Sequence, residues 1–390
     1  MAKIVFGWEF GASLGHIYPL LRVADALKEK GHDILFVCRD VDRSFDVVKS
    51  RGYPMIQAPF WKNLPIPNVR SISTPSYADI LARQGFAYRK TLQHMVSAWD
   101  DLLRILKPDL IIADHSPGLN IAVRKAIPMI NIGNGFTLPP TDIDVYPPIL
   151  AKGKRLVAQD MLMKQFNELH LERGREPYRR LPQIFDTEGQ FVCTLPHLDP
   201  YADIRIAPVC GPLEDCMEAA PPPEAPYVFM YMANEAEDSE LALEAVQKLG
   251  CQASVYIRGA SAERMQKYAS KHMTLLGKPA DFSDIIPKAS LVIHSGGSGT
   301  ATSCLMTGRP QVMFPRQSEA LMSGRLLTSQ GLAHSIGKGV GLDDLTHLLK
   351  QALDDHAMQD RCYQAALEIA QGDWKNALKK VTDRATELLS

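Results

Sequence analysis

The sequence predicts an α/β fold of two doubly wound, Rossmann-like domains, each built on a parallel sheet. Three observations lead to this prediction. The chain of 390 residues is too long for one ordinary hydrophobic core. Short apolar runs alternate with amphipathic stretches in both halves, as strands and helices do when a parallel sheet is covered on both faces. A proline-rich stretch without periodicity separates the halves. Two such domains imply a cleft between them, with ligands bound where strands end and helices begin.

The first half begins with a strand, a helix and a second strand. Residues 3–7 form a short apolar run, and residues 18–30 have the apolar spacing of a helix. Gly31 is suited to end that helix, and "DILFVC" predicts the next strand. Further along, "PDLIIAD" and "PMINIG" predict two buried strands on either side of a short helix.

The second half repeats this pattern after the proline-rich stretch. Apolar runs predict strands at 227–232, 253–258, 290–294 and 311–314, with helices between them. The tail from residue 342 onward is helical, with a break near Gly372. The domain prediction is therefore residues 1–209, a linker at 210–226, and a second domain at 227–372.

Composition excludes several classes of protein. Of the residues, 46% are hydrophobic and 22% charged, and the formal net charge of -1 gives no field that would attract nucleic acid or anionic lipid. No apolar run approaches the roughly 18–20 residues of a membrane span, and "MAKIVFGWEF" lacks the features of a secretory signal. The seven cysteines are scattered, with no C-x-x-C pair, so we expect no zinc site or disulfide framework. These features predict a cytoplasmic protein.

The stretch "HSGGSGTATSCLMTGRP" predicts an anion-binding turn in the second half. Glycines let a ligand approach the backbone, and the first amides of the following helix favour negative charge. The pattern is neither a Walker loop nor a dinucleotide fingerprint, and a diphosphate suits it. An ordinary capped strand–helix turn would also fit. The candidate donor-binding residues of this turn are His294, Ser295, Gly296, Gly297, Ser298, Gly299 and Thr300.

A polar loop, "PRQSEA", follows the next predicted strand. Arg316 and Glu319 would lie at the mouth of the cleft, where phosphates or sugar hydroxyls could be bound. A solvated loop with a helix cap at Ser318 is the alternative reading.

The stretch "GASLGHIYPL" predicts a second glycine turn, near the N-terminus. His16 ends this turn directly before a helix, and an imidazole can accept a proton from a hydroxyl at neutral pH. Asp114 ends the strand "DLIIAD", so it should lie at the same sheet edge and could orient that imidazole. We expect the neighbouring His115 to be a surface or cap residue. A capping role for His16 remains the alternative.

Two D-x-D strings, Asp40-Val-Asp42 and Asp142-Ile-Asp144, have a spacing that can hold a divalent metal. Such short patterns arise easily by chance, and the first opens a helix as acidic residues often do. We therefore predict no metal site.

Aromatic residues in the first half could line an acceptor cleft. Trp61, Phe86 and Tyr88 are the candidates for acceptor binding. A stripe of this kind is also typical of a plain hydrophobic core.

Taken together, these motifs resemble the family 1 glycosyltransferases, which have the GT-B architecture. The likeness covers most of the chain and is strongest in "GASLGHIYPLLRVADALKEKGHDILFV", "PDLIIAD", "CGPL" and "FSDIIPKASLVIHSGGSGTATSCLMTGRPQVMFP". The resemblance implies an inverting, metal-independent enzyme without a cofactor, which transfers a sugar from a nucleotide diphosphate such as UDP or dTDP to a small-molecule or lipophilic hydroxyl, as in natural-product or glycolipid biosynthesis. It further implies that a helix at about 373–390 packs back on the first domain.

The resemblance also assigns roles to residues. His16 looks like the general base, Asp114 like its orienting acid, and residues 297–300 like the pyrophosphate turn. Ser295 stands where the family commonly has a phosphate-binding histidine, and Ser303 replaces a glutamate that in many members binds ribose.

Three further positions depart from the family's pattern. Glu319 and Ala320 replace an aspartate–glutamine pair for sugar hydroxyls. Asn234 stands in the turn after the first strand of the donor domain and could replace the usual serine.

Two other functions fit the same residues. A nucleotide-sugar epimerase of this architecture would use the donor site without an acceptor. A degenerate homologue would bind a ligand or partner without catalysis, as the three departures at Ser295, Ser303 and Ala320 would favour. The expected partners are a nucleotide sugar and a small acceptor, and the chain would act as a monomer or homodimer.

Overall fold

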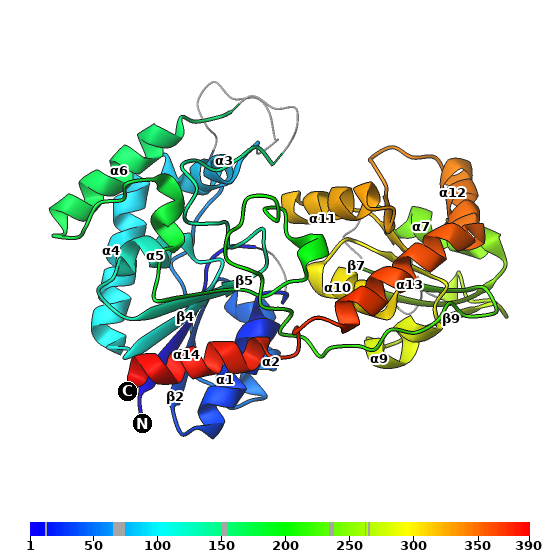
Figure 1. The fold of residues 1–390 in the computed structure, drawn as a ribbon, viewed down its shortest axis with the longest axis horizontal. Helices are drawn as coiled ribbons and strands as arrows, with labels where there is room; N and C mark the ends of the chain where they lie inside the picture. Colours follow the sequence, from blue (N-terminus) through cyan, green and yellow to red (C-terminus); the bar gives the residue numbers. More distant parts are fainter. Residues whose placement is uncertain (12–13, 65–74, 150–154, 234–237, 262, 264–265) are drawn as a thin grey trace. The chain divides into compact units, whose positions relative to one another are not determined.

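The computed structural model describes residues 1–11, 14–64, 75–149, 155–233, 238–261, 263 and 266–390. These residues form two compact units (Figure 1). Unit 1 consists of Met1–Thr194, Tyr201–Leu213 and Asn376–Ser390, and unit 2 of Leu195–Pro200 and Glu214–Lys375.

Unit 1 is built on a six-stranded parallel sheet with the strand order β3-β2-β1-β4-β5-β6. The strands are β1 (Lys3–Trp8), β2 (Asp33–Cys38), β3 (Met55–Gln57), β4 (Leu110–Asp114), β5 (Met129–Gly133) and β6 (Gly189–Val192). The helices are α1 (Ile17–Glu29), α2 (Val41–Lys49), α3 (Tyr77–Leu81), η1 (Ala82–Phe86), α4 (Arg89–Leu106), α5 (Pro117–Val123), α6 (Gln159–Glu172), η2 (Leu181–Phe185) and α14 (Ala377–Leu389).

Both faces of this sheet are covered by helices. Alternate residues of β1 point to opposite faces, so Ile4 and Val5 belong to different buried clusters. On the face of Ile4, the cluster includes residues of α1 and, from the end of the chain, Val381 of α14. Figure 1 shows this red helix beside α1. On the face of Val5, the cluster includes Trp99 of α4 together with residues of α5 and α6.

Unit 2 has a second six-stranded parallel sheet, with the order β12-β11-β10-β7-β8-β9. The strands are β7 (Tyr227–Ala233), β8 (Gln252–Arg258), β9 (Met273–Leu275), β10 (Leu291–His294), β11 (Gln311–Met313) and β12 (Ala333–Ser335). The helices are η3 (Pro196–Leu198), α7 (Ser239–Leu249), α9 (Phe282–Ile285), η4 (Ile286–Lys288), α10 (Ser298–Thr307), α11 (Ser318–Ser329), α12 (Leu342–Asp354) and α13 (His356–Ala370). The α/β class and the parallel sheets are confirmed.

The unit boundaries differ in detail from the predicted domains. Leu195–Pro200 belongs to unit 2 instead of the first domain, because Leu195 and Leu198 are buried with residues of α10 and α13. The predicted linker at 210–226 is divided between the units, since unit 1 extends to Leu213. Four short strands, β3, β6, β9 and β12, had not been predicted.

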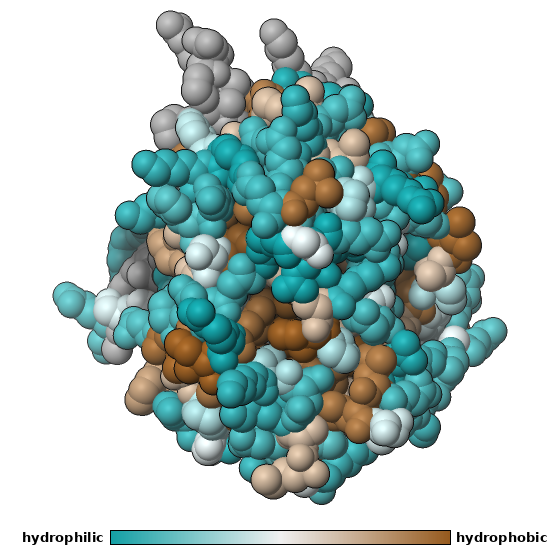
Figure 2. All heavy atoms as spheres, turned by 90° about the vertical axis from the view of Figure 1, so that its left-hand side faces the viewer, coloured by the Kyte–Doolittle hydropathy of each residue, from teal (hydrophilic) through white to brown (hydrophobic). Residues whose placement is uncertain are grey.

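No helix among the described residues is long and apolar enough to cross a membrane. On the face seen in Figure 2, hydrophilic side chains predominate and hydrophobic ones occupy a few separate areas.

Candidate active site

The first part of the candidate site lies at the carboxyl edge of the sheet in unit 1. β1 and β4 are neighbouring parallel strands, and Trp8 is opposite Asp114 in their register. Segments that follow the two strands therefore meet at one edge of the sheet. His16, directly before α1, reaches this edge, and its Nδ1 lies 3.1 Å from Oδ2 of Asp114. Both side chains are buried, with 8% and 3% of their surface exposed.

The contact with Asp114 orients the imidazole of His16. A carboxylate can only accept hydrogen bonds, so Nδ1 carries the hydrogen and Nε2 carries the lone pair when the ring is neutral. The indole of Trp8 stacks on the imidazole, with ring centroids 5.8 Å apart. This arrangement can take up a proton at Nε2 while the carboxylate stabilises the resulting cation.

Gly11 provides the space in which the imidazole of His16 lies. The residue has a φ of +94°, and a Cβ built on it would come within 2.1 Å of Nε2 of His16. Any other residue would therefore displace the ring. The first glycine of "GASLGH", Gly11, is therefore required by the position of His16.

His115 is buried, so the expectation of a surface or cap residue was wrong. Only 7% of it is exposed, and its φ of +45° is unusual for a residue other than glycine. Its ring lies 5.5 Å from the rings of both His16 and Phe10. Burial holds the pKa of His115 well below its ordinary value, so the ring is neutral. Among the described residues neither ring nitrogen has a hydrogen-bond partner.

A buried tyrosine, Tyr77, lies next to His115 and contacts a second one, Tyr146, and sequence reasoning missed both. The ring of Tyr77 is 6.1 Å from that of His115 and 5.1 Å from that of Tyr146. Neither hydroxyl has a hydrogen-bond partner within the described parts of the chain, and burial holds the pKa of each well above its usual value. These neutral groups could hydrogen-bond a ligand or water. No motif marks them, because they come from helix and loop segments far apart in sequence.

The structure assigns Trp61 and Phe86 to the core of unit 1, not to an exposed acceptor surface. They are 1% and 0% exposed, and their rings stack with centroids 3.9 Å apart. Tyr88, which precedes α4, is half-buried. The core alternative therefore holds for the first two residues, since neither side chain reaches the surface.

Glu9 organises the core beside the site, and no motif marks this residue. Its carboxylate is 1% exposed and accepts hydrogen bonds from Nε1 of Trp61 (2.8 Å), Nε1 of Trp99 and the amide of Leu119 (2.9 Å). The last contact holds the start of α5, the helix after Asp114. Burial raises the pKa of Glu9, and the hydrogen bonds oppose that shift.

The second part of the candidate site is the turn between β10 and α10 in unit 2. Gly296 has a φ of +87°, and a Cβ there would come within 2.9 Å of the side chain of Ala320. Gly297 is exposed and is the N-cap of α10, with no side-chain cap. A Cβ on Gly297 would meet nothing within 4 Å. The amides of residues 298–300 have no carbonyl partner inside the helix because they form its first turn. The turn thus combines open space with amide donors that the helix itself leaves without a carbonyl partner, which suits an anion.

His294 holds this turn from inside and is not turned toward a ligand. Its Nδ1 accepts from the amide of Gly296 (3.1 Å), and its Nε2 lies 2.9 Å from Oε1 of Gln311. Burial lowers the pKa of His294 to about 4, so the ring is neutral. The prediction that His294 binds the donor directly is corrected to a positioning role, because both ring nitrogens are engaged. Ser295 has a buried hydroxyl without a partner in the residues that the structure describes.

The guanidinium of Arg316 is also engaged by other groups of the protein, although we expected this residue at the mouth of the cleft. Its Nη2 lies 2.6 Å from Oδ2 of Asp238, and its Nη1 donates to the carbonyl of Ile336. The guanidinium therefore holds its loop to the start of α7 and to the end of β12. Glu319 lies half-buried in the first turn of α11. Asn234 lies outside the described residues.

Ser303, which replaces the family's glutamate, uses its hydroxyl inside α10. It donates to the carbonyl of Gly299 at 3.0 Å. This back-bonding is common for serine in helices and leaves no long side chain for a ribose at that position.

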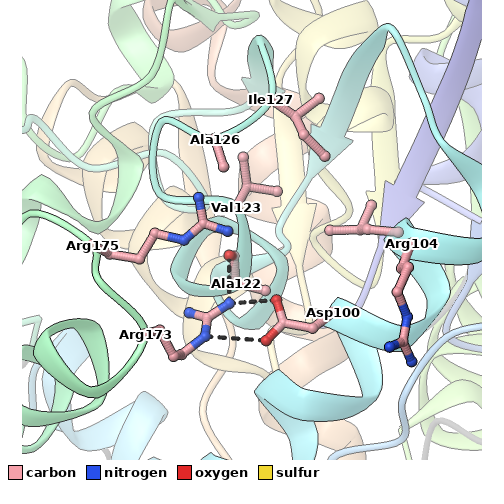
Figure 3. Close-up of a pocket in the computed structure, with 9 residues that line it drawn as sticks. Asp100, Arg104, Ala122, Val123, Ala126, Ile127, Arg173 and Arg175 are labelled. Carbon is pink, nitrogen blue, oxygen red and sulfur yellow. Dashed lines mark hydrogen bonds and ion pairs between the residues drawn. The ribbon is translucent and has the colours of Figure 1, made fainter.

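A groove of about 420 Å³ lies elsewhere in unit 1. It is lined by the end of α4, the end of α5 and the residues before β5. It therefore lies at the amino ends of the strands, whereas His16 lies at their carboxyl ends. Figure 3 shows Arg173 and Arg175 pointing into it, with Arg173 held by both carboxylate oxygens of Asp100 and by the carbonyl of Ala122. The groove is separate from the candidate site.

The D-x-D strings have structural contacts. Asp40 caps α2 by accepting from the amide of Arg43, and Asp144 lies 3.8 Å from Arg180. Within the described ranges, no group of three or more His, Cys, Asp or Glu side chains could hold a metal ion.

Comparison with known proteins identifies the fold. No family model matches the sequence. The chain is 23% identical to the L-demethylnoviosyl transferase of Streptomyces niveus over 352 residues, which are 86% of this chain and 85% of that protein.

Two solved glycosyltransferases resemble the chain over its length. The structure of CalG4, the calicheamicin glycosyltransferase, matches with a TM-score of 0.70 and 16% identity, covering 100% of this chain and 98% of its own. SsfS6 from Streptomyces sp. SF2575, complexed with thymidine diphosphate, matches with a TM-score of 0.62 and 19% identity, covering 98% and 100%. The chain has the GT-B fold, and the predicted resemblance to glycosyltransferase enzymes is confirmed.

Proposed function

We propose that this protein is a glycosyltransferase that moves a sugar from a nucleoside diphosphate to a hydroxyl of a small-molecule acceptor, with His16 as the general base. The observation that carries the proposal is the buried pair of His16 and Asp114, whose Nδ1 and Oδ2 are 3.1 Å apart. Its chemistry is that of a base oriented by a carboxylate. The open turn at Gly297, with the first amides of α10, supports the diphosphate half of the proposal.

The reaction is a single displacement at the anomeric carbon. Nε2 of His16 accepts the proton of the acceptor hydroxyl as that oxygen bonds to the carbon, and the bond from the carbon to the diphosphate oxygen breaks. The nucleoside diphosphate leaves with the bonding electrons, and the configuration of the carbon inverts. Asp114 stabilises the imidazolium, and the amides of α10 stabilise the growing negative charge on the leaving group.

The comparisons direct the choice of donor. A similar solved structure holds thymidine diphosphate, so a thymidine diphosphate sugar is the first donor to test. No metal or cofactor enters the proposed reaction, and transfer should survive a chelator.

Relatives named for natural products favour an acceptor of that kind. The buried hydroxyls of Tyr77 and Tyr146 and the ring of His115 would suit a partly aromatic acceptor with polar substituents.

The proposal is tested by calorimetry and product analysis with the intact protein. We expect thymidine or uridine diphosphate to bind, and mass spectrometry to show a glycosylated acceptor with one nucleoside diphosphate released per sugar. Conversion of the nucleotide sugar without an acceptor would instead identify the epimerase. Failure of every nucleotide to bind would favour the degenerate homologue.

Replacing Thr300 with valine tests the donor turn. Thr300 lies in the first turn of α10 and is 8% exposed. We expect kcat to fall by about 10²-fold, because one preorganised donor to the developing charge is lost. Thr346→Val is a matched control, since the Thr346 hydroxyl bonds back to the carbonyl of Leu342 within α12. Equal steady-state rates for the two variants would remove Thr300 from the donor site.

Replacing Gly11 with alanine tests the position of His16 without touching the imidazole. The new methyl group would displace the ring, so we expect transfer to fall by about 10²-fold, as a misplacement of about 1 Å can cause. Gly31→Ala is the matched control: Gly31 has a similar φ of +86° but open space around it. Transfer is measured at saturating donor. If both variants lost activity to the same extent, backbone strain and not the imidazole would explain the loss.

A further inference from the structure

Two cysteines that are far apart in sequence lie side by side in unit 1. The Sγ atoms of Cys193 and Cys210 are 3.6 Å apart. The sequence pattern gave no reason to pair them, because 16 residues (194–209) separate them and neither belongs to a C-x-x-C motif.

Backbone hydrogen bonds hold both residues at this position. Cys193 directly follows β6, and its amide donates to the carbonyl of Gly133, the last residue of β5. The amide of Cys210 donates to the carbonyl of Val192, the last residue of β6. The chain thus leaves the sheet at Cys193 and returns beside it at Cys210. The contact between the two thiols follows from the sheet, not from flexible side chains alone.

We propose that Cys193 and Cys210 form a reversible disulfide when the protein meets a small disulfide such as oxidised glutathione. A disulfide needs an Sγ–Sγ distance of about 2.05 Å. Adjustment of the two side-chain rotamers can close the present gap of 3.6 Å, with the backbone already fixed.

The chemistry is ordinary thiol–disulfide exchange. The thiolate of Cys193, the more exposed of the two, attacks one sulfur of oxidised glutathione and releases one glutathione. The thiolate of Cys210 then attacks the sulfur of Cys193 and releases the second glutathione. Two protein thiols are oxidised, one small disulfide is reduced, and the two protons end on the released thiols.

The surroundings favour Cys210 over the other buried thiols as the second nucleophile. In the reduced protein the contact with Cys193 lowers the pKa of Cys210, burial opposes this effect and Lys380 adds to it. Once Cys193 is in the mixed disulfide, Lys380 continues to lower the pKa of Cys210. Burial instead raises the pKa of Cys38 and of Cys362 to about 12. A lower pKa increases the fraction of reactive thiolate at neutral pH.

The disulfide would close a covalent loop that contains residues 194–209, and this segment belongs partly to each unit. Of the enclosed residues, Leu195–Pro200 belongs to unit 2, whereas Tyr201 onward belongs to unit 1. Leu195 is buried in one cluster with Ala301 of α10, the helix that begins at the donor turn. Oxidation would therefore restrain a crossing segment that contributes to the core beneath that turn.

The test exposes the folded full-length protein to oxidised glutathione, followed by alkylation and digestion with trypsin. Cleavage after Arg180, Arg205 and Lys248 places Cys193 and Cys210 in different peptides. We expect the two peptides to be joined in the oxidised sample, and separate and alkylated after treatment with dithiothreitol.

Variants identify the sulfur atoms and control for chance reactivity. Cys216 shares the second peptide, so Cys216→Ser should retain the cross-link and Cys210→Ser should lose it. Cys251→Ser, at a half-buried cysteine of unit 2, should also retain it. After oxidation, alkylation of both Cys193 and Cys210, a lasting glutathione adduct on Cys193, or a cross-link that appears only in denaturant would each overturn the proposal.

Discussion

Replacement of His16 with alanine is expected to lower the rate of sugar transfer by about 10²-fold or more. The variant lacks the group that removes the acceptor proton, and general-base help contributes about 10²–10⁴-fold. His16 belongs to unit 1 and the glycine turn to unit 2, so affinity for the nucleoside diphosphate should stay nearly unchanged. Product formation by mass spectrometry and nucleotide affinity by calorimetry give the two readouts.

Two further variants make this prediction specific. Asp114→Asn should also lower kcat strongly, because a neutral amide does not stabilise an imidazolium as a carboxylate does, and its NH2 group can donate to Nδ1 and hold the ring in the wrong tautomer. His94→Ala changes an exposed histidine of α4 and should leave transfer unchanged. If His16→Ala turned over its true substrates near the wild-type rate, the base would have to be another residue.

Replacement of Glu9 with alanine is expected to reduce the free energy of unfolding by about 3 kcal/mol or more. The change would leave the indole N–H groups of Trp61 and Trp99 and the amide of Leu119 buried without an acceptor. Each buried donor without a partner costs about 1–3 kcal/mol. Denaturant unfolding measures the loss, and Glu29→Ala, at an exposed residue of α1, should change it little.

Glu9→Gln separates the hydrogen bonds from the charge. The amide keeps one acceptor oxygen, so we expect a smaller loss than in Glu9→Ala. Burial raises the pKa of Glu9, and a raised pKa adds stability at low pH that is lost as the pH rises through the folded-state value. As the pH rises, the wild type should therefore lose stability relative to Glu9→Gln, whose side chain does not titrate. Equal stability of all three proteins would show that the carboxylate does not hold the core.

The elements that the sequence predicted best are the buried central strands. "DILFVC" has a continuous apolar run because both of its faces are covered, and the strand spans Asp33–Cys38 as expected. β3 and β12 are three residues long, too short for a periodic pattern, and they form only by pairing with a neighbouring strand. Edge strands of this length depend on tertiary context.

The candidate site was predictable where topology alone decides it. His16 follows β1 and Asp114 ends the neighbouring parallel strand β4, so their proximity could be expected, although the role of His16 as base stays a prediction. The hydrogen bond between His294 and Gln311 could not be expected, because it depends on the directions in which two side chains point within a buried sheet. Glu9 was missed and His115 was wrongly expected at the surface for the same reason, since an isolated polar residue in a sequence does not reveal its partners.

The last helix has a practical consequence for anyone who divides this protein into halves. α14 follows unit 2 in the chain, yet Ala377, Val381 and Ala385 belong to the buried cluster of unit 1. A gene fragment that ends before residue 376 would leave the first sheet lacking a covering helix, and recombinant expression of unit 1 alone would require that helix to be fused or supplied as a separate peptide. Chimaeras that exchange donor preference between relatives need junctions on both sides of unit 2, not a single crossover.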